Sequence, residues 1–102
     1  MSEYLPAAPI AQVPAGRGLT VHVAGREIAL LREGDQVYAL DNKCPHKGAP
    51  LSFGWVEKGK VACPMHGWEF ACETGACTDR PNVVVQRYEV KVEDGMVLVK
   101  VG

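Results

Sequence analysis

Alternating apolar and polar residues mark short β-strands in the first part of the chain. Residues 19–23 alternate, and an apolar run occupies residues 27–32 after an Ala24-Gly25 turn. Residues 36–40 indicate a third strand, which Asp41-Asn42 ends. The chain up to residue 42 is therefore predicted to form a small meander of antiparallel strands.

The C-terminal segment carries the clearest local pattern. Tyr88, Val90 and Val92 alternate with charged residues, and Asp94-Gly95 is a tight-turn dipeptide ahead of an apolar stretch over residues 96–101. This pattern predicts a terminal β-hairpin. A Pro- and Ala-containing stretch over residues 5–16 is expected to be an irregular lead-in or an edge strand.

The middle of the chain differs from both ends. Residues 43–82 hold all four cysteines, and no helical period of useful length occurs anywhere. We expect a loop-rich insertion with short strands near residues 53–56, 60–63 and 68–71. The predicted fold class is all-β: one domain over residues 1–102, with an antiparallel scaffold (about 1–42 and 83–102) that carries the insertion (about 43–82).

Length and charge exclude several function classes. The 102 residues fit one domain of ordinary size, and 11 basic residues against 12 acidic ones give a formal charge of −1. The basic residues are scattered, so no nucleic-acid partner is expected. No apolar run approaches the roughly 18 residues that span a bilayer, and no export signal is visible, so we expect a soluble, cytoplasmic protein without a membrane partner.

Two short segments carry the candidate chemistry, Cys44-Pro45-His46 and Cys63-Pro64-Met65-His66. In a reducing compartment four cysteines are metal ligands or buried thiols more often than disulfides. Two Cys and two His could hold one zinc ion, but common zinc modules take two close cysteines from one loop and two close histidines from another. Here each segment offers one thiolate and one imidazole. Two such loops can hold a [2Fe–2S] centre in which two His replace two Cys on one iron.

Cys44 to Leu51 and Cys63 to Phe70 resemble the two cluster-binding loops of Rieske iron–sulfur proteins. The resemblance extends from Arg17 to the terminal hairpin. It implies a Rieske-like fold and one Rieske-type [2Fe–2S] cluster as cofactor. The implied metal ligands are Cys44 and Cys63 on the inner iron, and His46 and His66 on the outer iron.

The resemblance also leads to a prediction of the redox potential. Two ferric ions, two sulfides and two thiolates sum to zero charge, so Rieske centres lie at roughly −150 to +300 mV, whereas plant-type four-Cys ferredoxins lie near about −400 mV. The family's high-potential branch has a disulfide where this chain has Ala49 and Met65, and hydroxyl donors where it has Trp68 and Phe70. We therefore predict a potential near the lower end of the Rieske range.

Other reactive or aromatic residues are expected to be structural. Cys72 and Cys77 lie outside both loops and are expected to be buried thiols, with a disulfide between them as the alternative. His22 is expected to face solvent, because it alternates with apolar neighbours. Trp55 and Trp68 are expected to pack against the loops.

The resemblance implies a one-electron carrier, a Rieske-type ferredoxin without catalytic residues of its own. Its expected partners are a flavin-dependent reductase and a terminal oxygenase, such as a ring-hydroxylating dioxygenase. The alternative is the small subunit of an assimilatory NAD(P)H nitrite reductase, which resembles the same fold. A mononuclear iron site like that of an oxygenase needs two further histidines and a carboxylate, and His22 is the one histidine left over.

Overall fold

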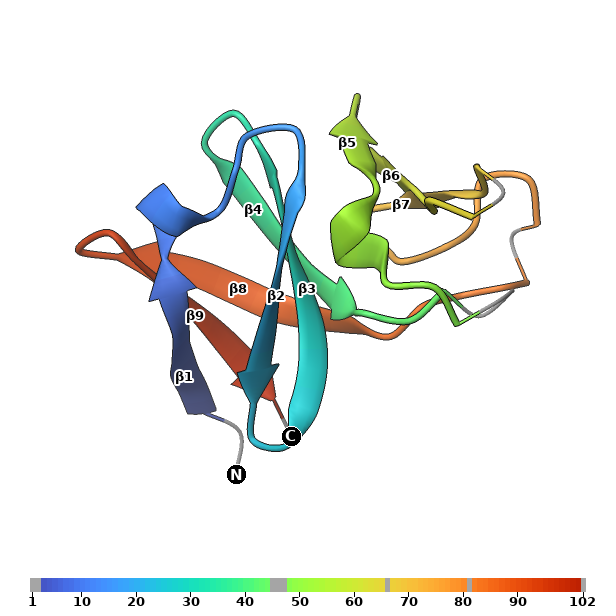
Figure 1. Cartoon of the computed structure of the whole chain (residues 1–102). Coiled ribbons are helices and arrows are strands. Elements are labelled where there is room, and N and C mark those ends of the chain that lie inside the picture. Colours follow the sequence, from blue (N-terminus) through green and yellow to red (C-terminus); the bar gives the residue numbers. More distant parts are fainter. Residues whose placement is uncertain (1–2, 45–47, 66, 81, 102) are drawn as a thin grey trace.

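The computed structural model describes residues 3–44, 48–65, 67–80 and 82–101, and two antiparallel β-sheets organise them (Figure 1). The larger sheet has six strands in the order β1-β9-β8-β4-β3-β2, and the smaller has three in the order β5-β6-β7. The strands are β1 (Glu3–Pro9), β2 (Gly18–Val23), β3 (Arg26–Glu33), β4 (Gln36–Asp41), β5 (Trp55–Glu57), β6 (Lys60–Ala62), β7 (Glu69–Ala71), β8 (Arg87–Glu93) and β9 (Met96–Val101). The predicted all-β, antiparallel fold class is confirmed.

The predicted meander and terminal hairpin are both present. Strands β2, β3 and β4 pair in sequence order, and β8 pairs with β9 across the Asp94-Gly95 turn. Of the two alternatives for the N-terminal segment, the edge strand is correct for Glu3–Pro9, which pairs with β9 and has an irregularity between Pro6 and Ala8. An edge position suits this segment because proline has no N–H to give to a second neighbour. A single 3₁₀ turn, η1 (Ile10–Gln12), follows.

Strand β3 is buried on both faces. Ile28 and Leu30 belong to a core enclosed by the six-stranded sheet, whereas Ala29 and Leu31 belong to a second core shared with the smaller sheet. All four residues have 0% exposure. This position between two cores explains why the middle of β3, residues 28–31, is continuously apolar. A strand with one solvated face would instead alternate apolar and polar residues.

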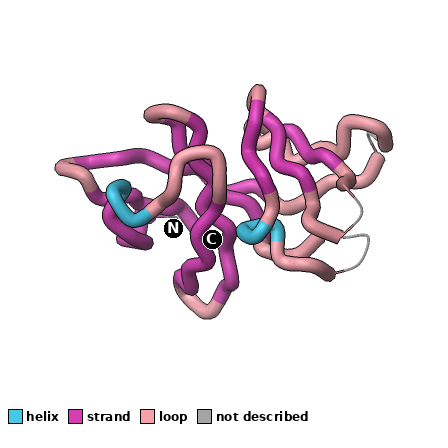
Figure 2. The backbone as a smooth tube through the Cα atoms, turned by 45° about the horizontal axis from the view of Figure 1, so that its top comes forward, coloured by secondary structure: helices cyan, strands magenta, loops and turns pink. Residues whose placement is uncertain are grey.

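The smaller sheet is attached to the larger one by specific polar contacts as well as by the second core. The Glu33 carboxylate at the end of β3 accepts hydrogen bonds from the backbone N–H groups of Lys58 (2.6 Å) and Gly59 (2.7 Å) in the β5–β6 turn. The Val56 N–H donates to the Gly16 carbonyl oxygen at 2.9 Å. Figure 2 shows β5, β6 and β7 grouped beside the larger sheet, with long loops at the far side.

Helical structure is minimal in the part of the chain that the structure describes. Besides η1 it consists of the 3₁₀ turn η2 (Leu51–Phe53), which lies between β4 and β5. No helix among the described residues is long and apolar enough to span a membrane.

Candidate metal centre

The first cysteine loop begins at Cys44, after the end of β4. The Cys44 N–H donates to the Ala49 carbonyl oxygen at 2.8 Å, and the Gly48 N–H donates to the Cys44 carbonyl oxygen at 2.6 Å. Gly48 has a φ of 73°, a conformation that residues with a Cβ rarely adopt. These two bonds hold Gly48 and Ala49 against Cys44.

The second cysteine loop closes the β6–β7 hairpin and repeats this arrangement. The Cys63 N–H donates to the Trp68 carbonyl oxygen at 2.7 Å, and the Gly67 N–H donates to the Cys63 carbonyl oxygen at 3.0 Å. Gly67 also has a φ of 73°. Each loop therefore places its cysteine first, a left-handed glycine four positions later and the acceptor carbonyl five positions later. Glycine suits both positions because it adopts a positive φ without the strain that a Cβ would add.

The two loops differ in the spacing of their histidines. His46 lies two positions after Cys44, whereas His66 lies three positions after Cys63. Both histidines lie outside the described residues, so their assignment as ligands stays a prediction. The N–H groups of Cys44, Gly48, Cys63 and Gly67 all donate to carbonyl oxygens. Any backbone donors to sulfur must therefore come from other amides of the loops.

The surroundings of Cys44 and Cys63 suit a bound iron–sulfur cluster. Each cysteine is 1% exposed, and both belong to the core shared by the two sheets, with Leu51, Val61 and Phe70 at 0% exposure. A thiolate in such an apolar setting is costly unless a metal neutralises it. Met65, in contrast, is 57% exposed between Cys63 and His66. The second loop thus combines a buried cysteine with a solvent-facing Met65.

The other two cysteines are buried thiols, as predicted. Cys72 and Cys77 are each 1% exposed, and neither forms a disulfide, so the alternative of a Cys72–Cys77 bond is wrong. Burial raises the pKa of Cys72 to about 12, and the carboxylate of Glu33 adds to this effect. A thiol that keeps its proton at neutral pH is a poor metal ligand and a poor nucleophile. Elsewhere in the described part of the chain, no three His, Cys, Asp or Glu side chains gather to form another metal site.

The predictions for the tryptophans and His22 have mixed outcomes. Trp68 is half-buried against the shared core, as expected, and the Arg80 guanidinium lies 4.2 Å from its ring centroid. The expectation that Trp55 packs against the loops is wrong: it is 55% exposed, because Val56 takes the inward position of β5, and Arg17 lies over its ring. The solvent-facing position of His22 is confirmed by its side-chain exposure of 70%.

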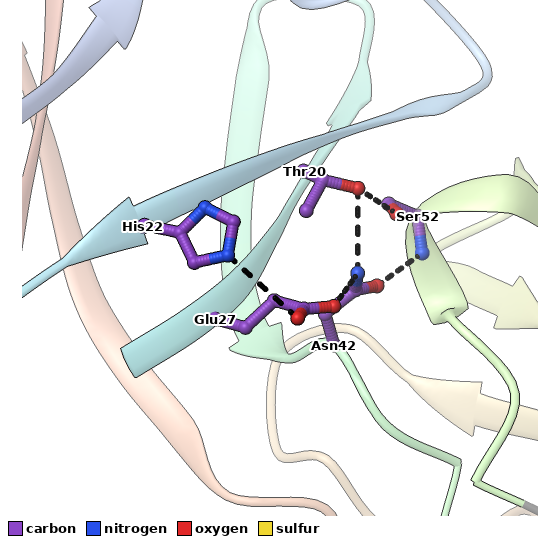
Figure 3. Close-up of polar contacts among 5 residues, drawn as sticks. All are labelled: Thr20, His22, Glu27, Asn42 and Ser52. Carbon is purple, nitrogen blue, oxygen red and sulfur yellow. Dashed lines mark hydrogen bonds and ion pairs between the residues drawn. The ribbon is translucent and has the colours of Figure 1, made fainter. Parts of the chain in front are cut away.

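One contributor to the site could not be assigned from the sequence. The sequence pattern indicates only that Asn42 follows the end of a strand, but its side chain is buried and forms hydrogen bonds with residues from three other elements (Figure 3). A polar residue two positions before a ligand candidate was the available signal. Its partners lie 10 to 22 positions away in the chain, which the local pattern does not show.

Comparison with known proteins agrees with this geometry. The family model for the Rieske [2Fe-2S] domain matches residues 3–92. A ferredoxin component of naphthalene 1,2-dioxygenase/salicylate 5-hydroxylase systems from Ralstonia sp. is 35% identical, and the match covers 95% of this chain and 94% of that protein. The oxygenase subunit of a 3-chlorobenzoate-3,4-dioxygenase from Comamonas testosteroni is 36% identical, but this chain spans only 25% of its length.

A solved structure gives a further match. The protein from Mycobacterium tuberculosis that was assigned as an NADH-dependent nitrite reductase small subunit superimposes with a TM-score of 0.91 at 30% identity. The match covers 100% of this chain and 97% of that chain. The two cysteine turns, the all-β fold and these matches lead to one conclusion: the chain belongs to the Rieske [2Fe–2S] domain family.

Proposed function

We propose that Cys44, His46, Cys63 and His66 ligate one [2Fe–2S] cluster, with the two cysteines on one iron and the two histidines on the other. The repeated turn at Cys44 and Cys63 supports this assignment, because two equivalent backbones present two buried sulfurs in the same way. When bound, the cluster accepts and returns a single electron.

The protein acts as a one-electron carrier between a flavin-dependent reductase and a terminal oxygenase. The observation that carries this proposal is the near end-to-end match to a ferredoxin component of a dioxygenase system. The oxygenase subunit, in contrast, is about four times longer than the region it shares with this chain. We further propose that the carrier works in the cytoplasm.

The chain's own residues divide the work. Cys44 and Cys63 lie in the core, where the exclusion of water protects the sulfur ligands from being replaced by solvent. Gly48, Met65 and Gly67 are exposed on the same loops, so a partner can approach there. In this proposal residues 43–82 bind the cluster, while residues 1–42 and 83–102 form the scaffold that holds them.

A second function is favoured by the structural match to the nitrite reductase small subunit. In that case the chain would serve as a permanent subunit beside a large sirohaem-containing subunit. The two functions differ in their partners: a carrier binds and leaves two proteins in turn, whereas a subunit stays bound to one.

The cluster and the function are tested separately. Iron and acid-labile sulfide are expected at two each per chain, and the reduced protein is expected to give an electron-spin resonance signal with the low average g of mixed Cys/His ligation. Zinc in place of iron would contradict the cluster.

For the function, stopped-flow mixing with a flavin reductase and then with an oxygenase should show reduction and reoxidation of the cluster. Stable co-purification with a sirohaem protein would instead favour the subunit.

A further inference from the structure

The first cysteine loop has no strand pairing across its ends. Strand β4, which precedes it, pairs with β3 and β8, and strand β5, which follows it, pairs with β6. The second loop, by contrast, joins two strands that pair with each other up to Ala62 and Glu69. Beyond the backbone bonds within its turn, the first loop therefore needs another means of attaching its ends to the sheets.

The Asn42 side chain connects the two ends of this loop. Its Oδ1 accepts a hydrogen bond from the backbone N–H of Ser52 at 2.7 Å, which joins the start of the loop to η2 beyond it. Asn42 is 4% exposed and Ser52 is 3% exposed. A buried N–H group that loses its acceptor destabilises the fold, so this bond has a large influence for a single contact.

The same side chain also binds the β2–β3 hairpin (Figure 3). Its Nδ2 donates to the Glu27 carboxylate at 2.9 Å and to the Thr20 hydroxyl at 3.3 Å. The Asn42 backbone N–H donates to the Glu27 carbonyl oxygen at 3.1 Å. Both N–H groups of the amide and its oxygen thus have partners, which only an amide of this length provides.

Ser52 and β2 complete the contact between the hairpin and η2. The hydroxyl oxygens of Thr20 and Ser52 lie 2.6 Å apart. At Gly18 a Cβ atom would lie 2.8 Å from the Ser52 Cα, so the absence of a side chain lets the two backbones approach. The ends of the loop are thereby fixed to a strand that is itself part of the larger sheet.

We infer that Asn42 is a positioning residue for the cluster: by fixing both ends of the first cysteine loop, it sets how firmly the cluster is retained and at what potential it is reduced. This inference rests on the proposed ligation by Cys44. Asn42 acts through the backbone that carries Cys44, two positions further along the chain, and does not need to touch the cluster itself.

Three variants of the holoprotein distinguish the effect of the Asn42 hydrogen bonds from the effect of a changed charge at Asn42 or Glu27. Asn42→Ala removes all three side-chain hydrogen bonds. Asn42→Asp keeps an acceptor for Ser52 but places a carboxylate against that of Glu27. Glu27→Gln keeps an oxygen acceptor for Asn42 and removes only the charge. His22→Ala is the matched control, because His22 is paired with Glu27 at 3.7 Å, whereas Figure 3 marks no hydrogen bond or ion pair between His22 and Asn42.

Three measurements follow each variant: hydrogen–deuterium exchange at the Ser52 amide, the rate of iron release to a chelator, and the midpoint potential. For Asn42→Ala we expect exchange and iron release to be faster by about tenfold or more, with a shifted potential. Asn42→Asp should keep the Ser52 amide protected yet release iron faster. Glu27→Gln should keep both rates near those of the unmodified protein, and His22→Ala should change none of the three.

Normal iron release and potential in Asn42→Ala would overturn the inference. Equal changes of iron release and midpoint potential in Asn42→Ala and Glu27→Gln would also overturn the inference, since the charge of Glu27 would then explain the effect of Asn42→Ala. If Asn42→Ala does not fold, Thr20→Val, which removes one of the three Asn42 side-chain hydrogen bonds and the hydroxyl contact with Ser52, should still release iron faster than His22→Ala does. Failure of the proposed function is distinguishable, because the unmodified protein would then lack the mixed-ligand signal while the exchange result for Ser52 would stand.

Discussion

The two cysteine loops share one turn but are supported in different ways. Cys44 and Cys63 begin turns with the same two backbone hydrogen bonds and the same φ of 73° at the following glycine. The second turn is the end of a β-hairpin, held by the ladder between β6 and β7. The first is held by the side chains of Asn42, Ser52 and Thr20.

This difference shows that the conformation of a cysteine turn does not depend on which contacts stabilise the loop. The turn itself is a property of the backbone and of a glycine at one position, and it forms both with and without a flanking ladder. A ladder distributes support over several backbone bonds, which no substitution of an exposed side chain other than one by proline removes. A side-chain network concentrates support in a few residues, so single substitutions before the first loop should have larger effects than those beside the second.

The largest expected effect is the same in both loops. Replacing either cysteine with serine, as Cys44→Ser or Cys63→Ser, should abolish the cluster, because a hydroxyl is a poor substitute for a thiolate ligand of iron. Iron content, labile sulfide and visible absorption measure the loss. A normal cluster in either variant would show that the loop in question does not supply a ligand.

The next expectation concerns both loops together. We expect a midpoint potential below zero, near the lower end of the range of roughly −150 to +300 mV known for Rieske centres. Ala49 and Met65 cannot form a disulfide, and the fully buried Phe70 offers no hydroxyl to a sulfur. Protein-film voltammetry measures the value, and a potential clearly above zero would contradict the prediction.

A pair of glycine substitutions tests whether the turns are equivalent. Gly48→Ala and Gly67→Ala should each cost about 1 kcal/mol, since the strain of a positive φ is equal and an added Cβ would meet no atom of the described residues closer than 3.7 Å. For a domain of this size that corresponds to a fall of about 4–8 °C in Tm. Unequal falls in the thermal midpoint of the holoprotein would show that the turns differ energetically. Gly25→Ala, at a hairpin turn far from the cysteines in the chain, is the matched control for strain alone.

The smallest effect on the cluster is expected outside the loops, at Cys72. Its pKa is about 12 in the folded protein against an ordinary value of 9.0, so the folded state holds the proton more tightly. Cys72 therefore makes its full contribution to the free energy of unfolding below pH 9. This contribution is lost as the pH rises toward 12, because the unfolded state releases the proton first. In Cys72→Ala the free energy of unfolding should therefore fall less steeply over this interval, as measured by urea unfolding, while iron content stays normal. Unchanged steepness would locate the titration elsewhere, for instance at Tyr38 or Tyr88, whose pKa values burial also raises.

The sequence is sufficient to predict the elements whose signals are local. Alternation located β2 to β4 and β8 to β9, and Cys-Pro followed closely by His located both cysteine loops. The orientation of Trp55 could not be predicted, because a three-residue strand has too few positions to define its inward face. The role of Asn42 could not be predicted either, since it depends on Thr20, Glu27 and Ser52, which meet only in the folded chain.

The double burial of strand β3 has a consequence for how this domain can vary over evolution. Ile28 and Leu30 fill one core while Ala29 and Leu31 fill the other. Inserting or deleting one residue within the strand would exchange the two sets, placing large side chains where Ala29 now fits and a small one among the bulky residues. Point substitutions of similar volume are therefore the tolerated route of change in β3, whereas changes of length are confined to the loops that lie away from it.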